Sequence, residues 1–197
     1  MDSLSFKCDS HIIIVAFGGY YNRVGGIPQF EFLNYLGQHF YDCDRVFYKD
    51  SSKSCYHNGI DGISRNIDET VEYLKTVIKG YSRVIFMGVS GGGYAAILFG
   101  SLLEITSVLA FIPQTLLLPD KYDPRYRDLK TVINNVTRYC IYGDSSITDP
   151  NDWHHIRHCE NIRSFPNVSV NNLPGLNLKT MRDSGELLTI LRNISSE

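Results

Sequence analysis

Short apolar runs alternate along the chain with longer segments in which apolar residues recur at helical spacing. Residues 11–17 are almost entirely apolar and rich in Ile, which is typical of a strand buried on both faces of a parallel sheet. Between residues 64 and 78, apolar residues recur mostly three or four positions apart, which predicts an amphipathic helix. Because strands and helices alternate in this way, we expect an α/β fold with a mostly parallel central sheet flanked by helices.

The same pattern continues to the end of the chain. Further strands are expected at residues 45–48, 83–88, 107–112, 138–142 and 168–170. Further helices are expected at residues 91–103, 152–162 and 178–191. Residues 116–131 show no clear period and are expected to form a surface excursion without a large lid. With no repeat or linker, we expect a single domain over residues 1–197.

Composition and charge narrow the possible partners. The formal net charge of -2 produces no field that would attract a nucleic acid or an anionic membrane, so neither is an expected partner. The N-terminus shows no signal-peptide pattern, and the apolar run at residues 11–17 is too short to span a bilayer. These features favour a cytoplasmic protein, and they do not predict its oligomeric state.

The cysteines and histidines do not form a metal-binding pattern. Five scattered cysteines without a CxxC pair argue against a disulfide framework and a zinc ribbon. His154 and His158 are four residues apart near Asp152 and Cys159, but no second group with metal-ligand spacing accompanies them. We therefore expect neither a metal nor another cofactor.

Ser90 lies in the sequence GVSGGG between an expected strand and an expected helix. A sharp strand-to-helix turn exposes and orients a serine hydroxyl, and small residues such as Gly88 and Gly92 make room for that turn. The N-terminus of the following helix would favour an oxyanion beside the serine. This context predicts Ser90 as the nucleophile of an α/β-hydrolase.

Two other interpretations of this glycine-rich turn fit less well. A Walker loop needs Lys and then Ser or Thr after the last glycine, where this chain has Tyr94 and Ala95. The dinucleotide-binding pattern needs glycine at the position that Ser90 occupies, and an earlier strand. A plain βα turn remains the structural alternative.

An oxyanion hole is expected beside Ser90. The backbone amide of Gly91 is the first candidate donor, because it follows the serine directly. The turn after residues 11–17 supplies a second donor, Gly19 or Tyr20, much as an HGG-type loop does in lipases and esterases. A simple strand-ending turn would explain these glycines equally well.

The acid and the base are harder to assign. In α/β-hydrolases the chain order is Ser, acid and His, and the candidates for the acid are Asp144, Asp149 and Asp152. Asp149 and Asp152 could equally serve the start of a helix. After the last expected strand there is no histidine, and Asn177 stands where the base is expected although it cannot accept a proton near pH 7.

The missing base leaves two possibilities open. Either the chain is catalytically inactive, or another histidine reaches Ser90. The nearest in sequence are His154, His155 and His158, which on a helix are more simply surface or packing residues.

The sequence resembles small microbial and viral α/β-hydrolase-like proteins that are associated with capsule and polysaccharide biosynthesis and are regarded as acyl esterases. The resemblance covers most of the chain, and residues 88–93 and 113–115 are its most specific part. The matching stretches are residues 17–19, 27–32, 56–59, 88–96, 111–115 and 182–187. In such proteins an aspartate is often followed three residues later by a histidine, which implies Asp152, paired with His155, ahead of Asp149.

These features lead to three functional hypotheses. The first is hydrolysis of a small acyl ester, with a sugar-linked acetyl group as a candidate, through Ser90. The second is a catalytically inactive binding protein on the hydrolase scaffold, and the third is acyl transfer to a sugar hydroxyl by the same serine. The expected partner is thus a small acyl ester or acylated sugar, in a polar pocket lined by Tyr20, Tyr21, Tyr56, His57 and Gln114.

Overall fold

The computed structural model describes residues 2–20, 23–24, 27–28, 30–118 and 121–196, and its main feature is a seven-stranded sheet. The strand order is β1-β5-β2-β6-β7-β8-β9, and all neighbours are parallel except β1 and β5. The strands are β1 Ser3–Phe6, β2 Ile12–Phe17, β5 Asp44–Tyr48, β6 Arg83–Val89, β7 Ser107–Phe111, β8 Arg138–Asp144 and β9 Val168–Leu173. The short strands β3 (Arg23–Val24) and β4 (Ile27–Pro28) pair separately. The expected α/β class with a mostly parallel sheet is confirmed.

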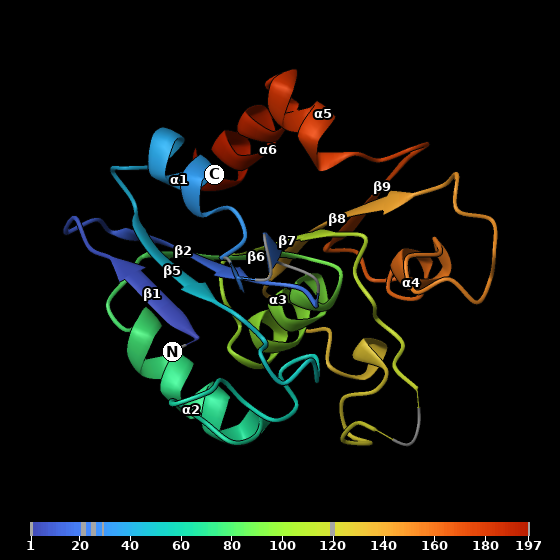
Figure 1. Cartoon of the computed structure of the whole chain (residues 1–197), viewed down its shortest axis with the longest axis horizontal. Coiled ribbons are helices and arrows are strands. Elements are labelled where there is room, and N and C mark those ends of the chain that lie inside the picture. Colours follow the sequence, from blue (N-terminus) through green and yellow to red (C-terminus); the bar gives the residue numbers. More distant parts are fainter. Residues whose placement is uncertain (1, 21–22, 25–26, 29, 119–120, 197) are drawn as a thin grey trace.

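Helices cover both faces of this sheet (Figure 1). The helices α2 (Ile67–Ile78) and α3 (Gly91–Leu102) pack on one face. On the other face lie α1 (Leu33–His39), α5 (Leu178–Asp183) and α6 (Glu186–Ser196), while α4 (Arg157–Glu160) lies near β8 and β9. Among the described residues, no helix is long and apolar enough to cross a membrane.

Strand β2 shows how the sequence builds two cores. Successive side chains of a strand point to opposite faces. Ile13, Val15 and Phe17 therefore pack against α2 and α3, whereas Ile14 and Ala16 pack on the side of α1 and α6. All five residues are buried, so the continuous apolar run reflects a strand covered on both faces.

Several elements differ from those expected. The helix expected at residues 152–162 is reduced to α4, because the Asp152 carboxylate accepts from the His154 backbone amide at 2.7 Å and stabilises a turn instead. The helix expected at residues 178–191 is divided into α5 and α6, which extends to Ser196. The edge strand β1 and the seven-residue helix α1 were not expected.

The turn from β6 into α3 leaves no room for side chains at two glycines. A Cβ atom on Gly88 would lie 2.3 Å from the backbone of Gly92. A Cβ atom on Gly92 would lie 2.1 Å from the carbonyl oxygen of Phe17, at the end of β2. The start of α3 therefore sits directly on the backbone of two neighbouring strands.

We predict that Gly92→Ala lowers the free energy of unfolding by about 1–3 kcal/mol or more, since the methyl group would displace backbone atoms. Gly37→Ala is the matched control, because Gly37 lies within α1 with no neighbouring atom within 4 Å of its Cβ position. That control should be unchanged or more stable by up to about 1 kcal/mol. Urea denaturation followed by circular dichroism measures both, and equal effects would contradict the packing argument.

Candidate active site

Ser90 occupies the sharp turn between β6 and α3. Its backbone has φ 55° and ψ -120°, a conformation that costs energy for a residue with a side chain. The turn is held by hydrogen bonds from Ser90 N–H to the carbonyl of Phe111 (2.9 Å) and from Tyr94 N–H to the carbonyl of Ser90 (2.9 Å). The Ser90 side chain is thus presented at the carboxyl end of the sheet, half-buried.

His154 contacts the hydroxyl of Ser90. The distance from His154 Nε2 to Ser90 Oγ is 2.8 Å, and the Gln114 side-chain amide donates to the same oxygen at 3.2 Å. Because Gln114 supplies a donor, the Ser90 proton is available to His154 Nε2, which then accepts it. This arrangement places a base in hydrogen-bonding distance of the hydroxyl.

Asp152 lies on the other side of the His154 ring. Its Oδ1 atom is 3.7 Å from His154 Nδ1 and also accepts the His154 backbone amide at 2.7 Å. The carboxylate thereby favours the tautomer with the proton on Nδ1, which leaves Nε2 free to accept from Ser90. Ser90 Oγ, the His154 ring and the Asp152 carboxylate thus lie in series, with the second separation, 3.7 Å, longer than a hydrogen bond.

A cavity of about 520 Å³ opens beside Ser90 and His154. This volume is within the usual range for small-molecule sites. Its wall combines hydroxyl, amide and ammonium groups with a few large apolar side chains. The lining residues are Tyr20, Ser52, Lys53, Ser54, Asn58, Ser90, Gln114, Leu118, Lys121, Tyr122, Trp153 and His154.

The expected oxyanion donors surround the same serine. A Cβ atom on Gly19 would lie 3.8 Å from Ser90 Cβ, and a Cβ atom on Gly91 would lie 3.4 Å from the Tyr20 ring. The Gly19 amide interacts with the carboxylate of Glu31. The amides of Tyr20 and Gly91 donate no hydrogen bond to another residue within the described part of the chain.

No protein-family model and no curated protein matches the sequence. Solved structures do match: a capsule O-acetyltransferase of Neisseria meningitidis serogroup A superposes with a TM-score of 0.67 at 14% identity, over 96% of this chain and 90% of that one. A lipase-esterase related protein from Clostridium acetobutylicum gives 0.61 at 11% identity, covering 98% of each chain.

An esterase of Thermogutta terrifontis matches with a TM-score of 0.56 at 12% identity, over 91% of this chain and 83% of that one. The chain has an α/β-hydrolase-like fold. Ser90 lies at the carboxyl end of β6 in this fold.

The structure brings only part of the expected pocket together. Tyr20 and Gln114 line the cavity, and the Tyr20 hydroxyl shares hydrogen bonds with Cys55 Sγ (3.0 Å) and the Tyr122 hydroxyl (2.9 Å). Burial raises the pKa of Tyr20 and raises that of the Cys55 thiol to about 12, so both groups stay uncharged. Tyr21 lies outside the described residues.

Tyr56 and His57 do not line the cavity. Tyr56 is fully buried, and its hydroxyl donates to the carbonyls of Gly18 (3.0 Å) and Tyr48 (3.2 Å). Tyr56 thus supports the turn that carries Gly19 from beneath. His57 is buried against Tyr94, at 2.8 Å from the Tyr94 hydroxyl. Their aromatic character reflects packing below the site instead of contact with a substrate.

Asn177 and Asp149 are explained by local structure. The Asn177 side chain caps α5 by accepting from the amides of Lys179 (2.9 Å) and Thr180 (3.1 Å). Asp149 is exposed and accepts from the amide of Asn151 at 2.8 Å. No hydrogen bond joins either side chain to Ser90 or His154, all four of which are described.

The remaining acid, Asp144, holds the loop after β9. Its Oδ1 accepts from Ser146 N–H (2.8 Å) and Gly175 N–H (2.9 Å). Burial raises the pKa of Asp144, but these hydrogen bonds outweigh it and the net pKa is lowered. Asp144 is therefore a structural anion of this loop.

The histidine at the serine was not the one expected from the usual order of elements. His154 was expected to be a surface or packing residue on a helix, and the Asp152–His155 spacing pointed to its neighbour. The turn stabilised by Asp152 directs His154 toward Ser90, while His155 Nδ1 accepts from Arg157 N–H at 3.0 Å. Trp153 and Lys121 were also missed, since nothing local in the sequence places them at the cavity.

No metal site accompanies these residues. Across the described ranges, no group of three or more His, Cys, Asp or Glu side chains is arranged to hold a metal ion.

Two buried histidines hold the chain between β7 and the 3-10 turn at Leu129–Thr131. The described residues of this segment are 112–118 and 121–128, and they include Gln114. His57 Nδ1 accepts from Asp123 N–H at 3.0 Å, and His158 Nδ1 accepts from Leu116 N–H at 3.3 Å. Both bonds require the ring nitrogen to be unprotonated. Burial lowers the pKa of each histidine to about 4.

We predict that this segment loses stability as the pH falls from about 6.5 to 4. In that range the unfolded chain binds protons at His57 and His158 that the folded chain does not, so unfolding is favoured; above pH 6.5 their contribution is complete. The unfolding midpoint in urea, measured at pH 7.5, 6 and 5, should fall less in His57→Gln/His158→Gln than in the wild type. His11→Gln, at an exposed position, is the control, and parallel curves for all three would contradict the prediction.

Proposed function

We propose that this protein cleaves small acyl esters through a covalent intermediate on Ser90. The observation that carries this proposal is the 2.8 Å contact between Ser90 Oγ and His154 Nε2 at a strained strand-to-helix turn. A serine hydroxyl is weakly nucleophilic unless an adjacent base removes its proton. The hydrolase fold supports the proposal, since esterases share it.

The residues act in sequence on the ester. His154 accepts the Ser90 proton as Oγ bonds to the acyl carbon, and then gives that proton to the departing alcohol oxygen. Water, deprotonated by His154, next attacks the acyl-enzyme and releases the acid. Asp152 keeps the ring oriented and stabilises its positive charge during both steps.

The oxyanion is stabilised by the amides of Tyr20 and Gly91. Gly91 directly follows Ser90, Tyr20 directly follows Gly19, and neither amide donates a hydrogen bond to another described residue. The Gly19 amide interacts with Glu31, which favours Tyr20 over Gly19 as the second donor. Each donor of this kind contributes about 3 kcal/mol to the transition state.

The cavity favours a small and polar acyl ester such as an acetylated sugar. Hydroxyl and amide side chains on its wall, from Ser52, Asn58 and Tyr122, suit the hydroxyl groups of a sugar. Trp153 at its edge is partly exposed and offers an apolar surface to a sugar ring. The volume of about 520 Å³ is small for a long-chain lipid ester.

The contact between Ser90 Oγ and His154 Nε2 favours a catalytic protein over the inactive-scaffold alternative. That alternative rested on the absence of a histidine after the last strand, and His154 stands at the serine instead. Acyl transfer to a sugar hydroxyl is the second candidate. It is favoured by the similarity in fold to a capsule O-acetyltransferase, of which a variant was solved in complex with CoA.

We predict that Ser90→Ala and His154→Gln each lower the rate of p-nitrophenyl acetate hydrolysis by about a hundredfold or more, because the nucleophile or its base is lost. Asn177→His should stay within about twofold of wild type, since Asn177 caps α5 at a distance from the chemistry. Circular dichroism confirms folding of each variant. A large gain from Asn177→His, or wild-type rates in His154→Gln, would assign the base elsewhere.

Substitutions at Asp152 and Asp149 test which aspartate acts as the acid of the proposed triad. We predict that Asp152→Asn lowers kcat by about tenfold or more, because the His154 ring loses its orienting charge. Asp149→Asn should leave kcat within about twofold, as this exposed carboxylate contacts its own turn. The reverse ranking would identify Asp149 as the acid.

Product analysis separates the two candidate reactions. We expect p-nitrophenyl acetate with a monosaccharide in excess to give mainly free acetate under hydrolysis. If the enzyme is a transferase, acetylated sugar should instead form in a Ser90-dependent manner and rise with sugar concentration. Mass spectrometry of the products, with Ser90→Ala as background, decides between them.

A further inference from the structure

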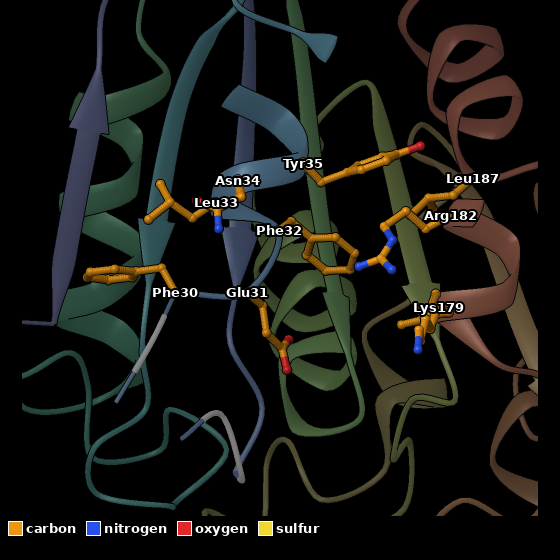
Figure 2. A pocket seen from close by; sticks show the side chains of 10 residues that line it. Phe30, Glu31, Phe32, Leu33, Asn34, Tyr35, Lys179, Arg182 and Leu187 are labelled. Atoms are coloured by element: carbon orange, nitrogen blue, oxygen red, sulfur yellow. The ribbon is translucent and has the colours of Figure 1, made fainter. Parts of the chain in front are cut away.

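A second cavity of about 600 Å³ lies between α1 and α5, on the sheet face opposite α2 and α3. Figure 2 shows Phe32 on the α1 side of this space and Arg182 on the α5 side, with the Arg182 side chain directed toward the Phe32 ring. Neither Ser90 nor His154 lines it, so it is distinct from the site proposed for ester cleavage. The lining residues are Phe30, Glu31, Phe32, Leu33, Asn34, Tyr35, Leu178, Lys179, Arg182 and Leu187.

Glu31 leaves an unsatisfied acceptor at this cavity. Its Oε2 atom is buried and has no hydrogen-bond partner among the described residues. A buried carboxylate oxygen without a donor costs free energy, so a donor supplied by a bound molecule would be favoured. Burial raises the pKa of Glu31 to about 7, although the Gly19 amide lowers it, so the carboxyl is only partly ionised near pH 7.

Two cationic side chains face the same space from α5. Arg182 extends from α5 toward the ring of Phe32, and Lys179 lies one helical turn before it (Figure 2). Arg182 is bonded to Asp183 at 2.8 Å, and Lys179 forms no ion pair with another described residue. A carboxylate or phosphate between the two would gain charge-assisted hydrogen bonds.

Aromatic rings complete the wall. Phe32 and Tyr35 come from the start of α1 and face the cations across the cavity (Figure 2). Flat apolar surface beside converging polar groups is typical of sites for small organic molecules.

We propose that the cavity between α1 and α5 binds a small hydroxylated organic anion. Its charged group lies between Lys179 and Arg182, a hydroxyl donates to Glu31 Oε2, and its ring packs against Phe32 and Tyr35. An acidic sugar and a hydroxylated aromatic acid share this chemistry. The inference does not depend on the proposed ester cleavage.

Isothermal titration calorimetry of the full chain at pH 7.5 tests the proposal with glucuronate and 4-hydroxybenzoate as probes. Glucose and phenol are the uncharged controls, and benzoate is the control without the hydroxyl. We expect saturable binding of at least one anionic probe and about tenfold weaker binding of its uncharged control. Tighter binding of glucuronate would identify the ligand as an acidic sugar, and tighter binding of 4-hydroxybenzoate would identify it as a hydroxylated aromatic acid.

Substitutions of the lining residues test whether the probes bind between α1 and α5. Arg182→Gln and Lys179→Gln should each weaken binding by about tenfold, whereas Lys75→Gln, an exposed change on α2, should not. Glu31→Leu should weaken binding of 4-hydroxybenzoate to the level of benzoate. All variants are checked for native unfolding midpoints.

Two outcomes would contradict binding of an organic anion between α1 and α5. No saturable binding below about 10 mM for either anionic probe, or binding unaffected by Arg182→Gln and Lys179→Gln, would overturn the proposal. Because binding is measured without turnover, this result is independent of whether Ser90 cleaves esters.

Discussion

The close approach of the start of α3 to the sheet is the constraint on which the site depends. Gly92 lies so near the Phe17 carbonyl that a single methyl group would not fit, and Gly88 is blocked by Gly92 in turn. Because α3 is buried along nearly its whole length, the helix cannot shift to relieve strain at its first residue. The unusual backbone of Ser90 is thus maintained by core packing, which fixes the serine at the carboxyl end of β6.

Local patterns in the sequence were sufficient for this part of the fold. The apolar run of β2, with Ile13 and Ile14 facing opposite cores, is recognisable because every position is buried. The turn at Ser90 is recognisable in the sequence because the start of α3 packs so closely on the strands that only glycine fits at positions 88 and 92. Both features are determined by neighbours close in sequence or by simple alternation. The short helix α1 carries no such signal, since its cap residue Phe32 makes no side-chain capping bond.

The contact between His154 and Ser90 could not be predicted in the same way. His154 and Ser90 are 64 residues apart, and their contact depends on the path of the chain after β8. A helical period suggested a continuous helix there, but the Asp152 carboxylate binds the amide of His154 and favours a turn. The Asp152 side chain thus both stabilises the turn and lies beside the His154 imidazole. The role of Tyr56 could not be predicted for the same reason: its hydroxyl donates to the buried carbonyl of Gly18, 38 residues away, and no local sequence pattern indicates that contact.

Glu31 lines the cavity between α1 and α5, and Tyr20, the residue after Gly19, lines the cavity beside Ser90. The Gly19 amide interacts with Glu31, and the Cβ position of Gly19 lies 3.8 Å from Ser90 Cβ. A molecule that donates to Glu31 would compete with the Gly19 amide for this carboxylate and would thereby act on the backbone that carries the Tyr20 amide. By thermodynamic reciprocity, any ligand at Ser90 that moves this turn would alter binding between α1 and α5 by the same factor.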